Sequence, residues 1–157
     1  MKFEIKNIKY PLSGWKIHIY GENEKDSRLV YSSIKDLILQ NNLSCKIALQ
    51  TFFEVTHKQK QEGKAVTVYF PPEVISENKL EKIIQGLKKD LEKINYKKDK
   101  QIFGDKKLSD SIYYRYELNI PLIKEGFGER AFDVHYRKSE GNYNIEYNPD
   151  PFESIKI

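Results

Sequence analysis

Alternating apolar and polar residues predict strands near the start of the chain. The segment 3–8 sets apolar residues among lysines, and residues 11–14 supply a turn after it. The segment 15–20 alternates more regularly, so its successive side chains should project to opposite faces of a sheet. As a strand it places Trp15, Ile17 and Ile19 on one face and Lys16, His18 and Tyr20 on the other.

Apolar residues that recur every three or four positions predict three helices. The first is capped by Asp26 or Ser27 and ends at residues 40–42. A second helix is expected over residues 50–61, before a glycine. The third starts at Pro71-Pro72 and carries the clearest apolar stripe, which consists of Leu80, Ile83, Ile84, Leu87, Leu91 and Ile94.

The remaining segments favour strands. Residues 44–49 fit a short strand or the entry to a helix, and residues 65–70 have the β-branched density of a buried strand. After a lysine-rich loop, strands are expected at 112–118, 131–137 and 143–147. Helices thus interleave with strands early and strands cluster late. This order predicts an α+β fold in which an antiparallel or mixed sheet packs against several helices, as a single domain over residues 1–157.

Composition removes several classes of protein. The 157 residues are 39% hydrophobic and 13% aromatic, which favours a folded chain over a disordered one. Cys45 is the only cysteine, so neither an internal disulfide nor a cysteine zinc cluster can form. No apolar run is long enough for a transmembrane helix, and the first residues lack the core of a signal peptide, so a cytoplasmic location is expected. The net charge of +4 hints at an anionic partner without identifying it.

Three short patterns carry candidate chemistry. Lys16 and His18 leave one strand face about 7 Å apart, and together they could bind an oxyanion and deliver a proton to it. Thr67 and Tyr69 share a face of the 65–70 strand, and Arg115 lies among tyrosines. Taken singly, each pattern is better explained by an ordinary strand.

Two other patterns are set aside. Residues 126–131 imitate a dinucleotide-binding motif without the required strand before and helix after it. The histidines His18, His57 and His135 lack metal-ligand spacing, so no metal is expected.

Taken in order, five segments resemble one known domain. They read W-K-I-H-I, C-K-I, G-K-A-V-T-V-Y, Y-Y-R-Y-E and N-P-D-P-F, and they extend from about Trp15 to Phe152. The chain resembles the phosphoserine/phosphothreonine lyase domain at the front of class III lanthipeptide synthetases. It is also similar, more distantly, to the phosphothreonine lyases that some bacteria inject as effectors. The resemblance implies β-elimination of phosphate from a phosphorylated precursor peptide, without a cofactor or metal, to leave dehydroalanine or dehydrobutyrine.

The resemblance also assigns roles. It implies that Lys46 is the base for the Cα proton and that His18 is the acid for the departing phosphate oxygen. Lys16 and Arg115 would hold the phosphate, and Tyr69 would support both the base and the phosphate. A lysine base must be neutral, and neighbouring cations and burial favour that form, whereas the phosphate dianion favours the charged form of a general acid.

Two positions depart from the pattern of that family. An arginine expected between the base and the G-K strand is missing, and Lys60 or Lys58 could replace it as a point charge. The second arginine that follows the Y-R of the effectors is also missing, and Arg137 could fill its role, with Arg130 less favoured. Full synthetases continue into kinase and cyclase domains. Because the chain has no kinase motifs, the resemblance implies a stand-alone lyase or an excised domain, with a kinase and a cyclase as its partners.

Two other functions remain open from the sequence. A non-catalytic module could bind the phosphopeptide or the leader peptide, although binding alone requires neither a base nor an acid. A nucleic-acid-binding domain would use the basic charge and the tyrosines, but the sequence has no RNP1-type signature, so no nucleic acid and no membrane are expected as partners.

Overall fold

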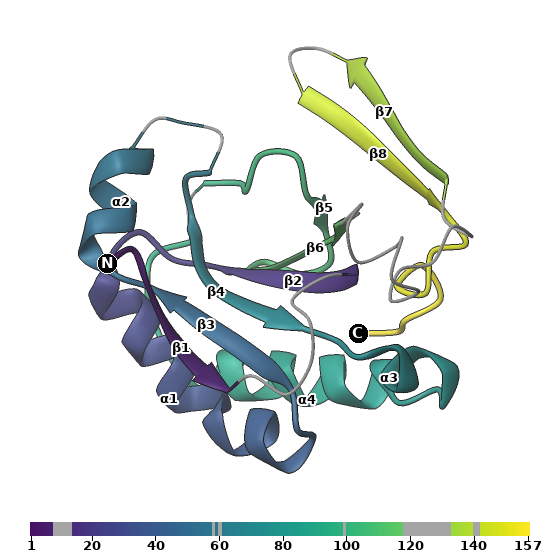
Figure 1. Cartoon of the computed structure of the whole chain (residues 1–157), viewed down its shortest axis with the longest axis horizontal. Helices are drawn as coiled ribbons and strands as arrows, with labels where there is room; N and C mark the ends of the chain where they lie inside the picture. The colour runs from purple at the N-terminus through teal and green to yellow at the C-terminus, as the bar shows by residue number, and fades with distance from the viewer. Residues whose placement is uncertain (8–13, 58, 60, 99, 118–132, 140–141) are drawn as a thin grey trace.

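The computed structural model describes the chain except residues 8–13, 58, 60, 99, 118–132 and 140–141 (Figure 1). For residue 117 and for the strands 133–139 and 142–148 it describes the backbone alone. Six of the described strands form one sheet, in the order β1-β3-β4-β2-β6-β5, with every neighbouring pair antiparallel. The described helices complete an α+β fold, which confirms the predicted fold class.

The six strands of the sheet are β1 (Phe3–Asn7), β2 (Gly14–Tyr20), β3 (Ser44–Ala48), β4 (Lys64–Tyr69), β5 (Lys106–Lys107) and β6 (Ile112–Glu117). The helices are α1 (Glu24–Gln40), α2 (Gln50–Thr56), α3 (Pro72–Ser76) and α4 (Leu80–Glu92). A second, two-stranded antiparallel sheet consists of β7 (Asp133–Ser139) and β8 (Asn142–Asn148).

The main core lies on one face of the six-stranded sheet. Figure 1 shows α1 and α4 on the same side of that sheet. Their apolar stripes include Ile34 and Leu87, both fully buried, and they pack with Ile17 and Val68 from the sheet. The alternation predicted for residues 15–20 is confirmed, because Trp15, Ile17 and Ile19 belong to this core. The opposite face is therefore left for polar residues.

The C-terminal segment completes the core beside β2 and β6. The ring of Phe152 stacks on Tyr114, with centroids 4.2 Å apart, and it also contacts the rings of Trp15 and Phe70. The Asp150 carboxylate accepts hydrogen bonds from the Tyr114 hydroxyl at 2.6 Å and from the Phe152 backbone N–H at 2.9 Å. The N-P-D-P-F segment thus has a structural role on the core side of the sheet.

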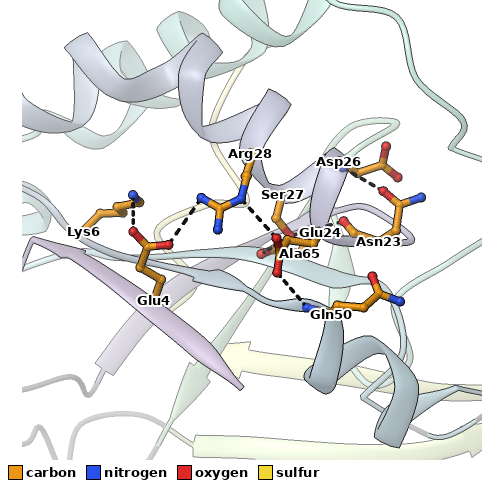
Figure 2. A network of polar contacts seen from close by, with 9 residues as sticks. All are labelled: Glu4, Lys6, Asn23, Glu24, Asp26, Ser27, Arg28, Gln50 and Ala65. Carbon is orange, nitrogen blue, oxygen red and sulfur yellow. Dashed lines mark hydrogen bonds and ion pairs between the residues drawn. The ribbon is translucent and has the colours of Figure 1, made fainter. Parts of the chain in front are cut away.

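Polar contacts at the start of α1 join three elements (Figure 2). Asn23, rather than Asp26 or Ser27, caps the helix by accepting a hydrogen bond from the Asp26 backbone N–H. Arg28 pairs with Glu24 of the same helix and with Glu4 of β1, and Glu24 accepts a hydrogen bond from the backbone N–H of Gln50 in α2. The first strand is thereby tied to the helical layer.

Two helix boundaries differ from the sequence prediction. The helix α2 ends at Thr56 rather than at residue 61. The expected single helix after Pro71 is divided into α3 and α4, because Asn78 adopts a left-handed backbone conformation with φ of 56° between them. Residues 44–49, which fitted either a strand or a helix entry, form β3. In the described part of the chain, no helix combines the length and the apolar character that crossing a membrane requires.

Candidate active site

The register of the central strands gathers polar residues on the face opposite α1 and α4. Directly opposed residues of neighbouring strands project their side chains to the same face. One row of such partners consists of Lys46, Thr67, His18 and Tyr113. The adjacent row consists of Ser44, Tyr69, Lys16 and Arg115. The five residues that the resemblance placed in one site, Lys46, His18, Tyr69, Lys16 and Arg115, therefore share one face of β3, β4, β2 and β6.

The ring of Tyr69 lies between two of these cations. Lys16 Nζ lies 5.7 Å and Lys46 Nζ lies 5.9 Å from its centroid, within the range of a cation–π interaction. Lys46 Nζ also lies 4.1 Å from the ring of Phe3 in β1. Lys16 is 8% exposed and Tyr69 is 3% exposed, so Lys16 lies in a largely desolvated, aromatic setting, whereas Lys46 is half-buried.

His18 lies in the middle of the site and contacts a buried carboxylate. Its side chain is 4% exposed, and its Nδ1 atom contacts Oδ2 of Asp105, whose side chain has no exposed surface. Asp105 belongs to the segment between α4 and β5, far from His18 in sequence. Because Nδ1 is engaged by a carboxylate, Nε2 is the nitrogen left for another partner.

The surroundings of His18 favour its neutral form when no substrate is bound. Burial lowers the pKa of His18 from 6.5 to about 4. The Asp105 carboxylate opposes this change by its charge and its hydrogen bond, whereas Lys64 and Lys16 add to it. A bound phosphate dianion would act in the same direction as Asp105 and would favour the imidazolium.

Arg115 shares the same carboxylate. Its Nη1 atom lies 3.8 Å from Oδ1 of Asp105, and 26% of its side-chain surface is exposed. Arg115 lies opposite Lys16 in the register of β2 and β6. A guanidinium and an ammonium thus lie side by side at this end of the site, which suits a phosphate.

Four residues that the sequence offered as further phosphate ligands have side chains outside the described part of the structure. Lys58 and Lys60 lie outside the described residues. Arg137 belongs to β7, opposite Asn144 of β8, and its side chain lies outside the described part of the structure. Arg130, the less favoured alternative, also lies outside the described residues. These assignments stay predictions.

The structure adds two residues that the sequence did not single out. Asp105 follows Gly104 in an irregular turn and left no periodic signal. Lys64 is 7% exposed, and its Nζ donates to Oε1 of Gln61 at 2.8 Å. A bulge between Ile19 and Tyr20 pairs Lys64 with Tyr20 and so turns it toward the site. The preceding Gly63 is required there, because its φ is 89° and a Cβ would lie 2.8 Å from the ring of Tyr20.

The described side chains do not form a metal centre. Among the residues with described placement, no group of three or more histidine, cysteine or carboxylate side chains is arranged to hold a metal ion. Cys45 is buried on the core side of β3, and burial raises the pKa of its thiol to about 12. The described charged side chains on this face are its lysines, its arginine and the His18–Asp105 pair.

The chain matches the model of one known protein family. The family model described as the N-terminal domain of RamC matches residues 1–141, which is most of the chain. RamC is a protein of lanthipeptide biosynthesis. A search among curated proteins found no match. The matched range includes all four strands that carry the candidate site.

Proposed function

The chain belongs to the family of RamC N-terminal domains, and from this membership and the geometry of the site we propose that it is a phosphoserine/phosphothreonine lyase. Its substrate in this proposal is a phosphorylated lanthipeptide precursor. It removes the phosphate by β-elimination and leaves dehydroalanine or dehydrobutyrine. The family links the chain to lanthipeptide biosynthesis, and the site supports this particular reaction.

The observation that carries the proposal is the convergence of Lys46, His18, Lys16 and Arg115 on one sheet face. Elimination of phosphate requires a base, an acid and cations for the leaving group, and these side chains supply all three functions. They come from β3, β2 and β6, which are far apart in sequence.

The distance between Lys46 and His18 suits a base and an acid that act on one substrate residue. Lys46 and His18 flank Thr67 in the same row, so their backbones lie about 10 Å apart, or two strand spacings. In the proposed complex the phosphorylated residue lies between them. Lys46 Nζ takes the Cα proton, the electron pair of the Cα–H bond forms the double bond, and the Cβ–O bond breaks. His18 Nε2 donates its proton to the departing oxygen.

The cations serve binding and catalysis together. Lys16 and Arg115 balance the charge of the phosphate and of the oxygen that leaves. Neighbouring positive charge also favours the neutral amine that Lys46 needs in order to act as a base. His18 starts as a neutral imidazole in the free protein, and the incoming dianion favours its protonation, which prepares the acid only when substrate is bound.

The test is the fate of a synthetic phosphopeptide. Peptides with one phosphoserine or phosphothreonine are incubated with the full chain and followed by mass spectrometry. We expect loss of phosphoric acid and a product that adds a thiol across its new double bond. Matched samples with Lys46→Met should retain their phosphate.

Two results would contradict the proposal. A product with a restored hydroxyl, which is heavier by one water and inert to thiols, would identify a phosphatase. Binding of the phosphopeptide without any release of phosphate would identify a binding module. In the proposed pathway a kinase domain or protein supplies the phosphopeptide and a cyclase uses the dehydro product.

A further inference from the structure

Asp105 occupies an unusual position for an acidic residue. Its side chain has no exposed surface, although its carboxylate belongs to an irregular segment between α4 and β5. One oxygen contacts Nδ1 of His18, and the other lies 3.8 Å from Nη1 of Arg115. One carboxylate thus joins the proposed acid in β2 and a proposed phosphate-binding residue in β6.

Burial of this carboxylate is costly without good partners. A buried charge needs pairing and hydrogen bonds to offset the water it loses. Within the described part of the chain, Oδ1 of Asp105 has no hydrogen-bond partner, although Arg115 lies near it. Fold stability alone would favour an apolar or smaller residue here, so a role through its neighbours explains the carboxylate better.

The segment that carries Asp105 is anchored against the same sheet face. Ile102 packs with Tyr20 and Tyr113 in a small second core, and Tyr96 packs against it. The Tyr96 hydroxyl donates to the backbone carbonyl of Tyr20 at 2.7 Å. These contacts hold the segment against Tyr20 of β2 and against Tyr113 of β6, which lies opposite His18. They therefore hold the carboxylate near the imidazole.

A carboxylate on Nδ1 determines how the imidazole can act. In the neutral ring the proton lies on Nδ1 and is donated to Asp105, which leaves Nε2 as an acceptor directed away from the carboxylate. When the ring is protonated, the carboxylate stabilises the imidazolium and Nε2–H becomes the donor. The same logic applies when an aspartate orients a catalytic histidine in other enzymes.

We propose that Asp105 is a positioning residue that holds His18 with Nε2 toward the leaving phosphate oxygen and supports its imidazolium form. This inference rests on the proposed lyase function for its catalytic consequence. In the elimination step the proton passes from Nε2 to the oxygen as the Cβ–O bond breaks, and the negative charge of Asp105 stays opposite the ring. The groups that face His18 are Asp105, Lys64 and Lys16, so removal of Asp105 leaves the ring among cations.

The first test compares Asp105→Asn with the wild type in phosphate release from a phosphothreonine peptide. The amide keeps the size of the side chain and removes its charge. We expect kcat to fall about 100-fold or more while KM changes little, because the ring loses its orientation and the phosphate ligands stay. The alkaline limb of the pH profile of kcat, where the acid His18 loses its proton, should also move to lower pH because the Asp105 charge no longer stabilises the imidazolium. Asp110→Asn removes an exposed charge five residues away and should leave both unchanged.

The second test does not depend on turnover. In the full-length wild type, ¹⁵N spectra of the histidine ring, assigned with His18→Gln, should show the Nδ1–H tautomer for His18 at neutral pH. An Nε2–H tautomer would overturn the inference, and so would an Asp105→Asn variant with unchanged kcat and pH profile. Absence of lyase activity in the wild type would remove the proposed function, and the tautomer would still decide whether Asp105 orients His18.

Discussion

The ammonium groups of Lys16 and Lys46 lie against the same aromatic ring, that of Tyr69, at 5.7 and 5.9 Å from its centroid. The two lysines belong to β2 and β3, the strands on either side of β4. An aromatic face attracts cations within about 6 Å. One ring therefore contacts both the proposed base and a proposed phosphate-binding lysine.

Substitution of Tyr69 separates the ring from the hydroxyl. Tyr69→Leu removes both cation contacts, and we expect phosphopeptide turnover to fall about tenfold or more. Tyr69→Phe keeps the ring, so its activity should stay within about threefold of the wild type. Both variants are compared in steady-state phosphate release. If Tyr69→Phe lost as much activity as Tyr69→Leu, the hydroxyl would be the functional group and the ring contact would be incidental.

Lys46→Met removes the proposed base and preserves much of the side-chain volume. We expect single-turnover phosphate release to fall by about 100- to 10,000-fold, which is the usual effect of losing a general base. Phosphopeptide binding, measured by fluorescence anisotropy, should change little because Lys16 and Arg115 remain. The control is Lys35→Met, which removes an exposed lysine of α1 on the other side of the sheet. Near-full activity of Lys46→Met would exclude Lys46 as the base.

The sequence could place in the site those residues whose side chains share one face of a strand, because alternate residues of a strand project to the same face. A period of two puts Lys16 and His18 on one face, and a partner strand needs only correct register to add Tyr69 and Lys46. Alternation says nothing of which strands are neighbours. The resemblance to a known family supplied that link, and the register of β3, β4, β2 and β6 agrees with it.

Asp105 shows why the rest of the site could not be predicted. It belongs to a turn without periodicity, and its contact with His18 spans 87 positions of the chain. The division of α3 from α4 is similar, because the apolar stripe continues while Asn78 adopts a positive φ. Asparagine tolerates the left-handed conformation, but its presence alone does not require that conformation. Both features depend on tertiary packing.

Phe152 is expected to contribute strongly to stability. It is 1% exposed and contacts the rings of Tyr114, Trp15 and Phe70, although it lies beyond the range matched by the family model. Phe152→Ala should lower the free energy of unfolding by about 3–5 kcal/mol, as measured by urea denaturation. Ile157→Ala, a change at a 41% exposed residue, should cost about 0.5 kcal/mol or less. Equal effects of the two substitutions would mean that the C-terminal segment is not packed on the core in solution.

The buried imidazole of His18 makes folding stability depend on pH in a defined direction. Its pKa is lowered from 6.5 to about 4 by burial, so between these values the unfolded chain binds a proton that the folded chain does not. The contribution of the neutral ring is complete above about pH 6.5. It is lost as the pH falls toward 4, and the total loss is about 3 kcal/mol.

The measurement is the free energy of unfolding of the wild type and of His18→Gln in urea, at intervals from pH 7 to pH 4. The wild type should lose stability relative to His18→Gln across this window, because glutamine cannot take up a proton in the unfolded state. His57→Gln, at an exposed position after α2, provides the matched control and should follow the wild type. Parallel curves for the wild type and His18→Gln would show that folding leaves the pKa of the imidazole unchanged. A wild type that gained stability relative to His18→Gln as the pH fell from 7 toward 6 would show that the imidazole already carries its proton in the folded state. In that case the free protein would hold a preformed His18–Asp105 ion pair, and substrate would not be needed to charge the acid.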